Sequence, residues 1–160
     1  MKANEPARGR SSAASATSPT GAVPAPPSPA DAPSQHFPDV KSLVVDGQRV
    51  REVDALLSLE SASLVVRLRD EGTVLRMLPY RAITAATYAR GRRPRGQAAP
   101  NAAAIPENFG GSGFLGGARH WLTLQTAGEF VVVRLEDRNV IRVMNGIESR
   151  TGLKVQRTDN

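Results

Sequence analysis

The chain has 160 residues, enough for one ordinary domain, and its 21 basic and 15 acidic side chains give a formal net charge of +6. It contains no cysteine, which excludes a disulfide framework, a zinc site built on thiolates and a cysteine nucleophile. Aromatic residues make up only 4% of the chain, so it offers few platforms on which nucleic-acid bases could stack.

Residues 1–40 differ from the rest of the chain in composition. Apart from the initiator methionine, their large apolar side chains are Val23, Phe37 and Val40, in a segment dominated by Ala, Pro, Ser and Thr. So little apolar surface cannot offset the entropy that is lost when a chain becomes ordered. We therefore predict a disordered tail over 1–40 and one folded domain over 41–157. The three basic and three acidic residues of the tail cancel, which leaves the whole charge of +6 on the remainder.

Short apolar runs separated by turn residues predict antiparallel strands along the domain. Asp46-Gly47 lies between two such runs and supplies the positive φ angles of a tight hairpin. Pro79 cannot donate to a ladder, so it should end its strand or place that strand at a sheet edge. The Ala-rich composition of 82–89 would allow a helix, but its Ile, Thr and Tyr residues favour a strand. The runs that we interpret as strands are 43–45, 48–50, 55–59, 64–68, 74–78, 82–89, 120–124 and 130–135.

The segment 137–152 has the pattern of an amphipathic helix. Its apolar residues recur at i, i+1, i+3, i+4 and i+7, and they form one stripe that we expect to pack on the sheet. Asp137 or Asn139 would cap the first turn, and Gly152 would adopt the left-handed conformation that ends the helix. Gly146 in the middle indicates a close approach to a strand. The residues of the stripe are Val140, Ile141, Val143, Met144 and Ile147.

Residues 90–119 show no sustained period, and Gly, Pro, Ala and Asn dominate them. We predict a long loop here, inside a domain whose other turns are short. Loops of this length are usually functional or disordered.

Several motifs of the chain follow one another in an order shared with a known family. They are Leu78-Pro79-Tyr80-Arg81-Ala82-Ile83 leading to Tyr88, then Arg92-Arg93, then His120-Trp121-Leu122-Thr123-Leu124, and finally a helix that ends at Arg150-Thr151-Gly152. In this order they resemble small bacterial domains with a pleckstrin-homology-like (PH/GRAM-like) fold, over about 43–157. The resemblance implies a mainly β fold, a barrel or sandwich of about seven antiparallel strands capped by one C-terminal α-helix. Lipid-binding relatives hold phosphates with basic residues near the first strands, and no Lys-x-Arg motif matches theirs here.

The candidate binding site is a cluster of arginines at the start of the long loop. Four guanidinium groups in six residues could neutralise phosphates of a lipid or of a nucleic acid. The alternative is a solvated basic loop that binds nothing. The cluster consists of Arg90, Arg92, Arg93 and Arg95.

Three apolar residues of the same loop, Phe109, Phe114 and Leu115, could insert at a membrane interface. Their alternative is to pack under the edge of the barrel, because exposed aromatic side chains promote aggregation. Trp121, the only tryptophan, alternates within an apolar run, and we expect it to pack in the core or at its rim.

A catalytic site is not expected. The chain has two histidines, His36 in the tail and His120 at the start of a strand, and its acidic residues fall at predicted turns. The Gly-rich segment 110–117 lacks the Lys and the Ser or Thr that a phosphate-binding loop requires. We therefore predict a non-catalytic binding or scaffolding module without a cofactor or metal. A protein partner or an anionic lipid surface would be its ligand, with nucleic acid as the alternative.

The sequence contains no apolar run typical of a signal peptide or of a transmembrane segment. It predicts a cytoplasmic protein, with export as the alternative.

Overall fold

The computed structural model describes residues 33–46, 49–95 and 117–159. Within these residues, eight strands form one hydrogen-bonded sheet in the order β4-β3-β2-β1-β7-β6-β5-β8. All neighbouring strands are antiparallel except β5 and β8, which are parallel. The strands are β1 (Gln35–Asp46), β2 (Arg49–Leu59), β3 (Ser63–Leu68), β4 (Val74–Pro79), β5 (Ala85–Gly91), β6 (Arg119–Gln125), β7 (Phe130–Leu135) and β8 (Gln156–Asp159).

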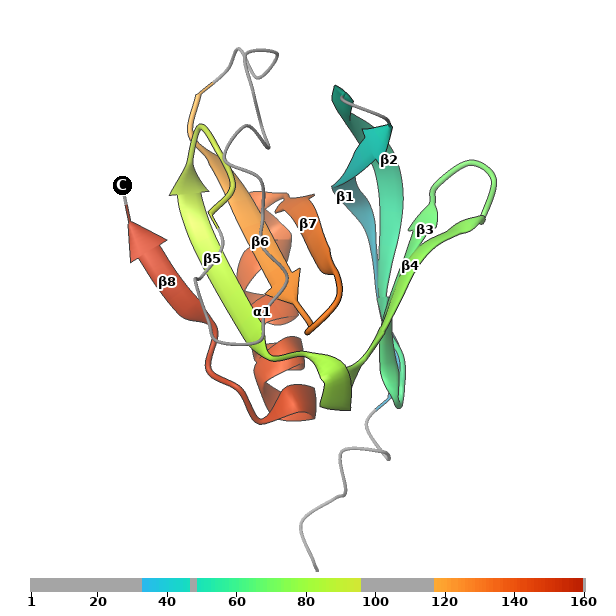
Figure 1. Cartoon of the computed structure of the whole chain (residues 1–160), viewed down its shortest axis with the longest axis vertical. Helices are drawn as coiled ribbons and strands as arrows, with labels where there is room; N and C mark the ends of the chain where they lie inside the picture. The colour runs from blue at the N-terminus through green and yellow to red at the C-terminus, as the bar shows by residue number, and fades with distance from the viewer. Residues whose placement is uncertain (1–32, 47–48, 96–116, 160) are drawn as a thin grey trace, which may run out of the picture.

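The sheet is bent into two halves, and one helix covers the second of them. Figure 1 shows β1–β4 in one half and β5–β8 in the other, with α1 (Asp137–Thr151) behind β6 and β7. A short 3-10 turn, η2 (Tyr80–Ala82), connects β4 to β5 and so links the two halves. Strands β4 and β8 form the two edges, so the sheet does not close into a barrel.

One apolar core lies between the two halves and the helix. Side chains alternate between the faces of each strand, so Leu122 and Leu124 of β6 enter this core while Trp121 lies on the opposite face. There Trp121 is fully buried against Leu43 and Val132, which confirms the expectation that it packs rather than stacks on a ligand. The helix contributes Val140, Val143, Met144 and Ile147 to the main core.

The predicted start of the domain at residue 41 is wrong, because β1 begins at Gln35. Phe37 and Val40, counted with the tail, are 1% and 3% exposed in the core. Asp39 forms ion pairs with Arg69 and Arg138, so it belongs to the folded part as well. Residues 41–160 carry a formal charge of +6. When the segment with Asp39 is included, residues 33–160 have 18 basic and 13 acidic residues and a formal charge of +5. The rest of the predicted tail, 1–32, lies outside the described residues.

The strand count also differs from the prediction. Eight strands are present rather than about seven, because four residues after the helix, Gln156–Asp159, pair with β5 as β8. The runs predicted at 48–50 and 55–59 form one strand, β2. The predictions of a hairpin between β1 and β2 and of an edge strand ending at Pro79 are confirmed.

Two of the predictions for the helix are confirmed and two are wrong. Gly152 ends it with a φ of 72°, and a Cβ on Gly146 would lie 2.5 Å from Leu59 Cδ1, so the helix does approach a strand closely. Ile141 is 57% exposed, since the stripe that faces the sheet is narrower than predicted. The N-cap residue is Glu136, which makes no side-chain capping bond, and Asp137 pairs with His120 instead.

Candidate functional site

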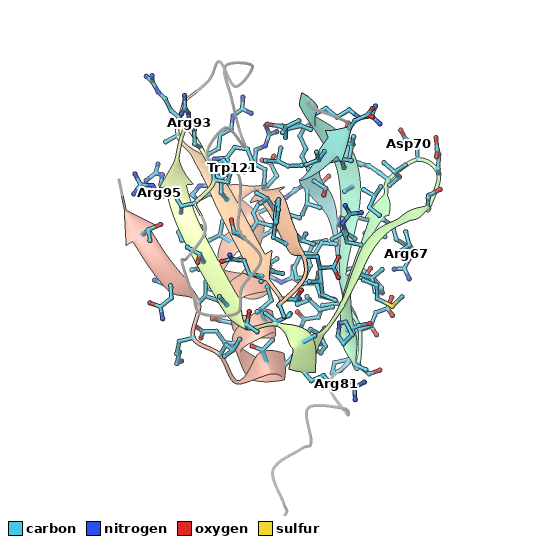
Figure 2. All side chains as sticks on the ribbon, viewed as in Figure 1. Arg67, Asp70, Arg81, Arg93, Arg95 and Trp121 are labelled. Carbon is cyan, nitrogen blue, oxygen red and sulfur yellow. The ribbon has the colours of Figure 1, made fainter. Side chains whose placement is uncertain are left out.

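The arginine cluster lies where β5 ends. Arg90 is the penultimate residue of β5, and Arg92, Arg93 and Arg95 follow the strand directly; all four are exposed. Figure 2 shows Arg93 and Arg95 at this end of β5, whereas Arg67 lies on β3 in the other half and Arg81 lies in η2, the connection between the halves. The predicted loop therefore begins two residues later than expected, and its first arginine is held by a strand.

The main chain at the root of the cluster is fixed by β6. Arg90 pairs in register with His120, and Gly91 pairs with Arg119. The indole Nε1 of Trp121 donates a hydrogen bond to the carbonyl oxygen of Gly91 over 3.1 Å. Because Trp121 is buried, this bond anchors the residue that directly precedes Arg92. The strand pairing and the indole together hold the start of the cluster in place.

The arginines surround a hollow of about 430 Å³. Most of the residues that line it belong to one continuous stretch, 89–95, and the remaining one, Ala118, directly precedes β6. The described residues that line it include four arginines and no carboxylate: Ala89, Arg90, Gly91, Arg92, Arg93, Pro94, Arg95 and Ala118.

Arginines elsewhere in the domain are mostly neutralised by carboxylates. The carboxylate of Glu52 accepts from Arg119 at 3.0 Å and from Arg134 at 2.8 Å. Arg119 is thus neutralised, even though it lies only two residues in sequence from Trp121, which anchors the root of the cluster. Other pairs are Arg51–Asp46, Arg67–Glu60, Arg69–Asp39, Arg76–Glu129 and Arg138–Asp39. In the described part of the chain, no carboxylate lies within ion-pair distance of Arg90, Arg92 or Arg93. No described carboxylate neutralises their positive charge.

A hydrogen-bonded chain that the sequence did not predict lies beside Arg90. The hydroxyl of Tyr88 lies 2.5 Å from Nδ1 of His120, and Nε2 of His120 lies 2.7 Å from a carboxylate oxygen of Asp137. These three residues come from β5, β6 and the first turn of α1, at sequence separations that no motif would suggest. Tyr88 is buried and belongs to the core, so the chain of bonds ties the helix to the sheet.

The remaining predicted contacts are not tested. Phe109, Phe114 and Leu115 lie outside the described residues, so their part in membrane insertion stays a prediction. Within the described ranges, no three side chains of His, Cys, Asp or Glu gather as metal ligands would. The helix that the structure describes is not long and apolar enough to cross a membrane.

Neither a family model nor a curated protein matches the sequence. Among solved structures, the fold is similar to a chain in the structure of the Spt16D Pob3N heterodimer, with a TM-score of 0.51 and 8% sequence identity. The match covers 81% of this chain and 56% of that chain, so this protein spans little more than half the length of its structural neighbour. At such low identity the similarity shows the fold alone: a mainly β, PH-like fold with one C-terminal helix.

Proposed function

We propose that this chain is a non-catalytic binding module that attaches to anionic, phosphate-bearing membrane surfaces through Arg90, Arg92, Arg93 and Arg95. The observation that carries the proposal is that one hollow gathers arginines without a described carboxylate beside them. Seven other arginines have carboxylates within 4.0 Å, whereas Arg90, Arg92 and Arg93 have none among the described residues. The described arginines outside the hollow that also have none are Arg81, Arg142, Arg150 and Arg157. Guanidinium groups suit such a ligand because each can form two parallel hydrogen bonds to phosphate oxygens.

A lipid surface fits the site better than a nucleic acid does. Proteins that bind single strands stack the bases on exposed aromatic rings. Here the single tryptophan, Trp121, is fully buried, and aromatic residues make up only 4% of the chain. A basic hollow without stacking platforms can neutralise phosphates but has little means of holding bases.

A protein partner is a second candidate. The structural neighbour is part of a heterodimer, which supports binding to another protein as a use of this fold. The match covers 56% of that neighbour's chain at 8% identity, so it does not assign a protein-binding surface to this chain.

Co-sedimentation with vesicles tests the membrane proposal. The full chain would be mixed with vesicles of neutral lipid and with vesicles that contain anionic lipid, at low and at high salt. We expect binding only to the anionic vesicles, and release at high salt because the arginines are exposed and their charges are screened. Replacement of Arg90, Arg92, Arg93 and Arg95 by Ala should abolish it, since each basic residue near such a surface contributes about 1 kcal/mol.

A matched control distinguishes an effect of the arginine hollow from an effect of net charge alone. A variant with Ala at Arg51, Arg69, Arg81 and Arg142 also loses four positive charges, but from exposed positions outside the hollow. It should keep most of the vesicle binding. Equal losses in the two variants, or no salt-sensitive binding by the unmutated chain, would refute the proposal. Binding to DNA but not to anionic vesicles would favour the nucleic-acid alternative.

A further inference from the structure

The sheet has a split between β1 and β7. These two strands pair through Val40↔Leu135, Lys41↔Arg134 and Ser42↔Val133. β1 then continues for four residues, Leu43–Asp46, which pair with β2 and, within the described chain, have no ladder partner on β7. The beginning of β7 pairs in turn with β6. The two strands therefore diverge past Ser42 and leave a wedge between them.

A groove of about 470 Å³ occupies this wedge. One wall is β1, the other is the start of β7 with the turn before it, and β4 contributes the third side. Most of the lining side chains are apolar: Leu43, Val44, Val45, Leu75, Phe130 and Val131. Val45, which lines the groove, is 47% exposed, and Val74, the neighbour of Leu75 in the chain, is 46% exposed, although both are large apolar residues.

The wall on β1 is the edge of a strand. In an antiparallel ladder alternate residues direct their N–H and C=O groups to the same neighbour. Two of the four residues Leu43–Asp46 therefore point these groups away from β2 and toward the wedge. Such an edge is a template for another extended chain. The groove thus offers main-chain hydrogen bonds and apolar contacts side by side.

We propose that this groove binds an extended, apolar segment of a partner protein, which pairs with Leu43–Asp46 of β1 and places alternate apolar side chains over Leu75 and Val131. An extended peptide matches both features, because its backbone satisfies the strand edge and its side chains fill the groove. A small apolar molecule would fill the volume but leave the main-chain groups of β1 without partners.

The charges at the rim also favour such a segment. Arg76 of β4 and Glu129 of the β6–β7 turn lie 4.0 Å apart across the groove. At the end of β1, Asp46 and Arg51 form a second pair at 4.0 Å. Since both rims are balanced, the groove gives no preference to either sign of charge, and its apolar lining selects an uncharged segment. This site shares no lining residue with the arginine hollow, so it goes beyond the proposed membrane attachment.

Amide NMR of the full chain provides the test. The probe is an equimolar pool of acetylated, amidated heptapeptides in which Val, Ile, Leu or Phe alternates with Thr. We expect chemical-shift changes at Leu43–Asp46 and at Ala127–Val131, and none at Arg90–Arg95. A control pool, in which Pro replaces each Thr, keeps the apolar side chains but lacks the N–H donor at every replaced position, and it should leave these amides unchanged.

Two variants on β4 sharpen the result. Leu75→Ala removes a side chain that lines the groove, whereas Met77→Ala removes an exposed one that does not. The first should weaken peptide binding about tenfold and the second should leave it unchanged. Absence of shifts, shifts centred elsewhere, or equal effects of the two pools would overturn the proposal. If the dye anilinonaphthalene sulfonate shifts these amide signals and the peptides do not, the groove is a pocket for small molecules instead.

Discussion

At the scale of single residues, the carboxylate beside an arginine decides what that arginine can bind. Glu52 neutralises Arg119 and Arg134, which lie 67 and 82 residues further along the chain. The density of arginines in the sequence was enough to predict the cluster at Arg90–Arg95. It could not show which arginines are neutralised, because those pairings depend on strand register between distant segments. That Arg90, Arg92 and Arg93 have no carboxylate partner among the described residues is therefore a finding of the structure.

Tyr80 provides a prediction about pH. It is 7% exposed and its hydroxyl donates to the carbonyl oxygen of Glu60 over 2.8 Å. Burial raises the pKa of Tyr80 from 10.0 to about 12, against the opposing effect of Arg150. Because the pKa is higher in the folded state than in the unfolded state, this residue's contribution to stability is complete below pH 10. It is lost as the pH rises from 10 to about 12.

Ultraviolet absorbance of tyrosinate during an alkaline titration measures this. Tyr80→Phe should remove the ionisation of one tyrosine near pH 12 from this titration. If the substituted chain keeps the full tyrosinate absorbance change near pH 12, the assignment to Tyr80 is wrong.

At the scale of elements, the helix was the most predictable part of the fold. Its apolar period and Gly152 predicted its position and its end, since both depend on local geometry. Ile141 was misassigned because successive helical residues are about 100° apart, so a stripe centred on Val140, Val143 and Ile147 leaves it at the margin. β8 was missed altogether: four residues carry too little pattern, and its pairing with β5 spans about half the domain.

The close contact of Gly146 leads to a second prediction. Alanine usually stabilises a helix by about 1 kcal/mol relative to glycine. Here the added Cβ would lie 2.5 Å from Cδ1 of the fully buried Leu59, and overpacking of a core costs about 1–3 kcal/mol. Gly146→Ala should therefore lower the free energy of unfolding by about 1 kcal/mol. Urea unfolding, followed by the fluorescence of Trp121, measures the change.

Asn145→Ala is the matched control, because Asn145 is exposed on the same helix. It should leave the free energy of unfolding unchanged or raise it slightly. A Gly146→Ala variant as stable as the unmutated chain would mean that Leu59 can move aside, and that the contact does not constrain the helix.

At the scale of the whole molecule, the strand pattern and the closing helix predicted a mainly β fold capped by one helix, and the family resemblance implied that this fold is PH-like; both are confirmed. They were not sufficient to predict that the sheet stays open, or that β1 and β7 diverge after Ser42. Local patterns predict strands, but the extent of pairing between β1 and β7 depends on how the sheet bends. The apolar groove follows from that divergence, so no run of residues in the sequence could have indicated it.

The domain therefore presents two separate surfaces, a basic hollow at the end of β5 and an apolar groove between β1 and β7. We have proposed that the first binds phosphates and the second an extended peptide, so a module with both would hold a partner protein at a membrane surface. Of the residues that the structure describes, those of the arginine hollow carry the proposed attachment.

The most direct test of that attachment is an amide NMR titration of the unmutated chain with inositol hexakisphosphate, a soluble ligand that carries phosphates without a lipid. We predict shift changes at Gly91, Arg92, Arg93, Arg95 and Ala118 that diminish as salt is raised. The indole N–H of Trp121 should shift with them, because it is bonded to Gly91. The account would be contradicted by the absence of shifts, or by shifts centred on Arg67 or Arg81, which lie away from this end of β5.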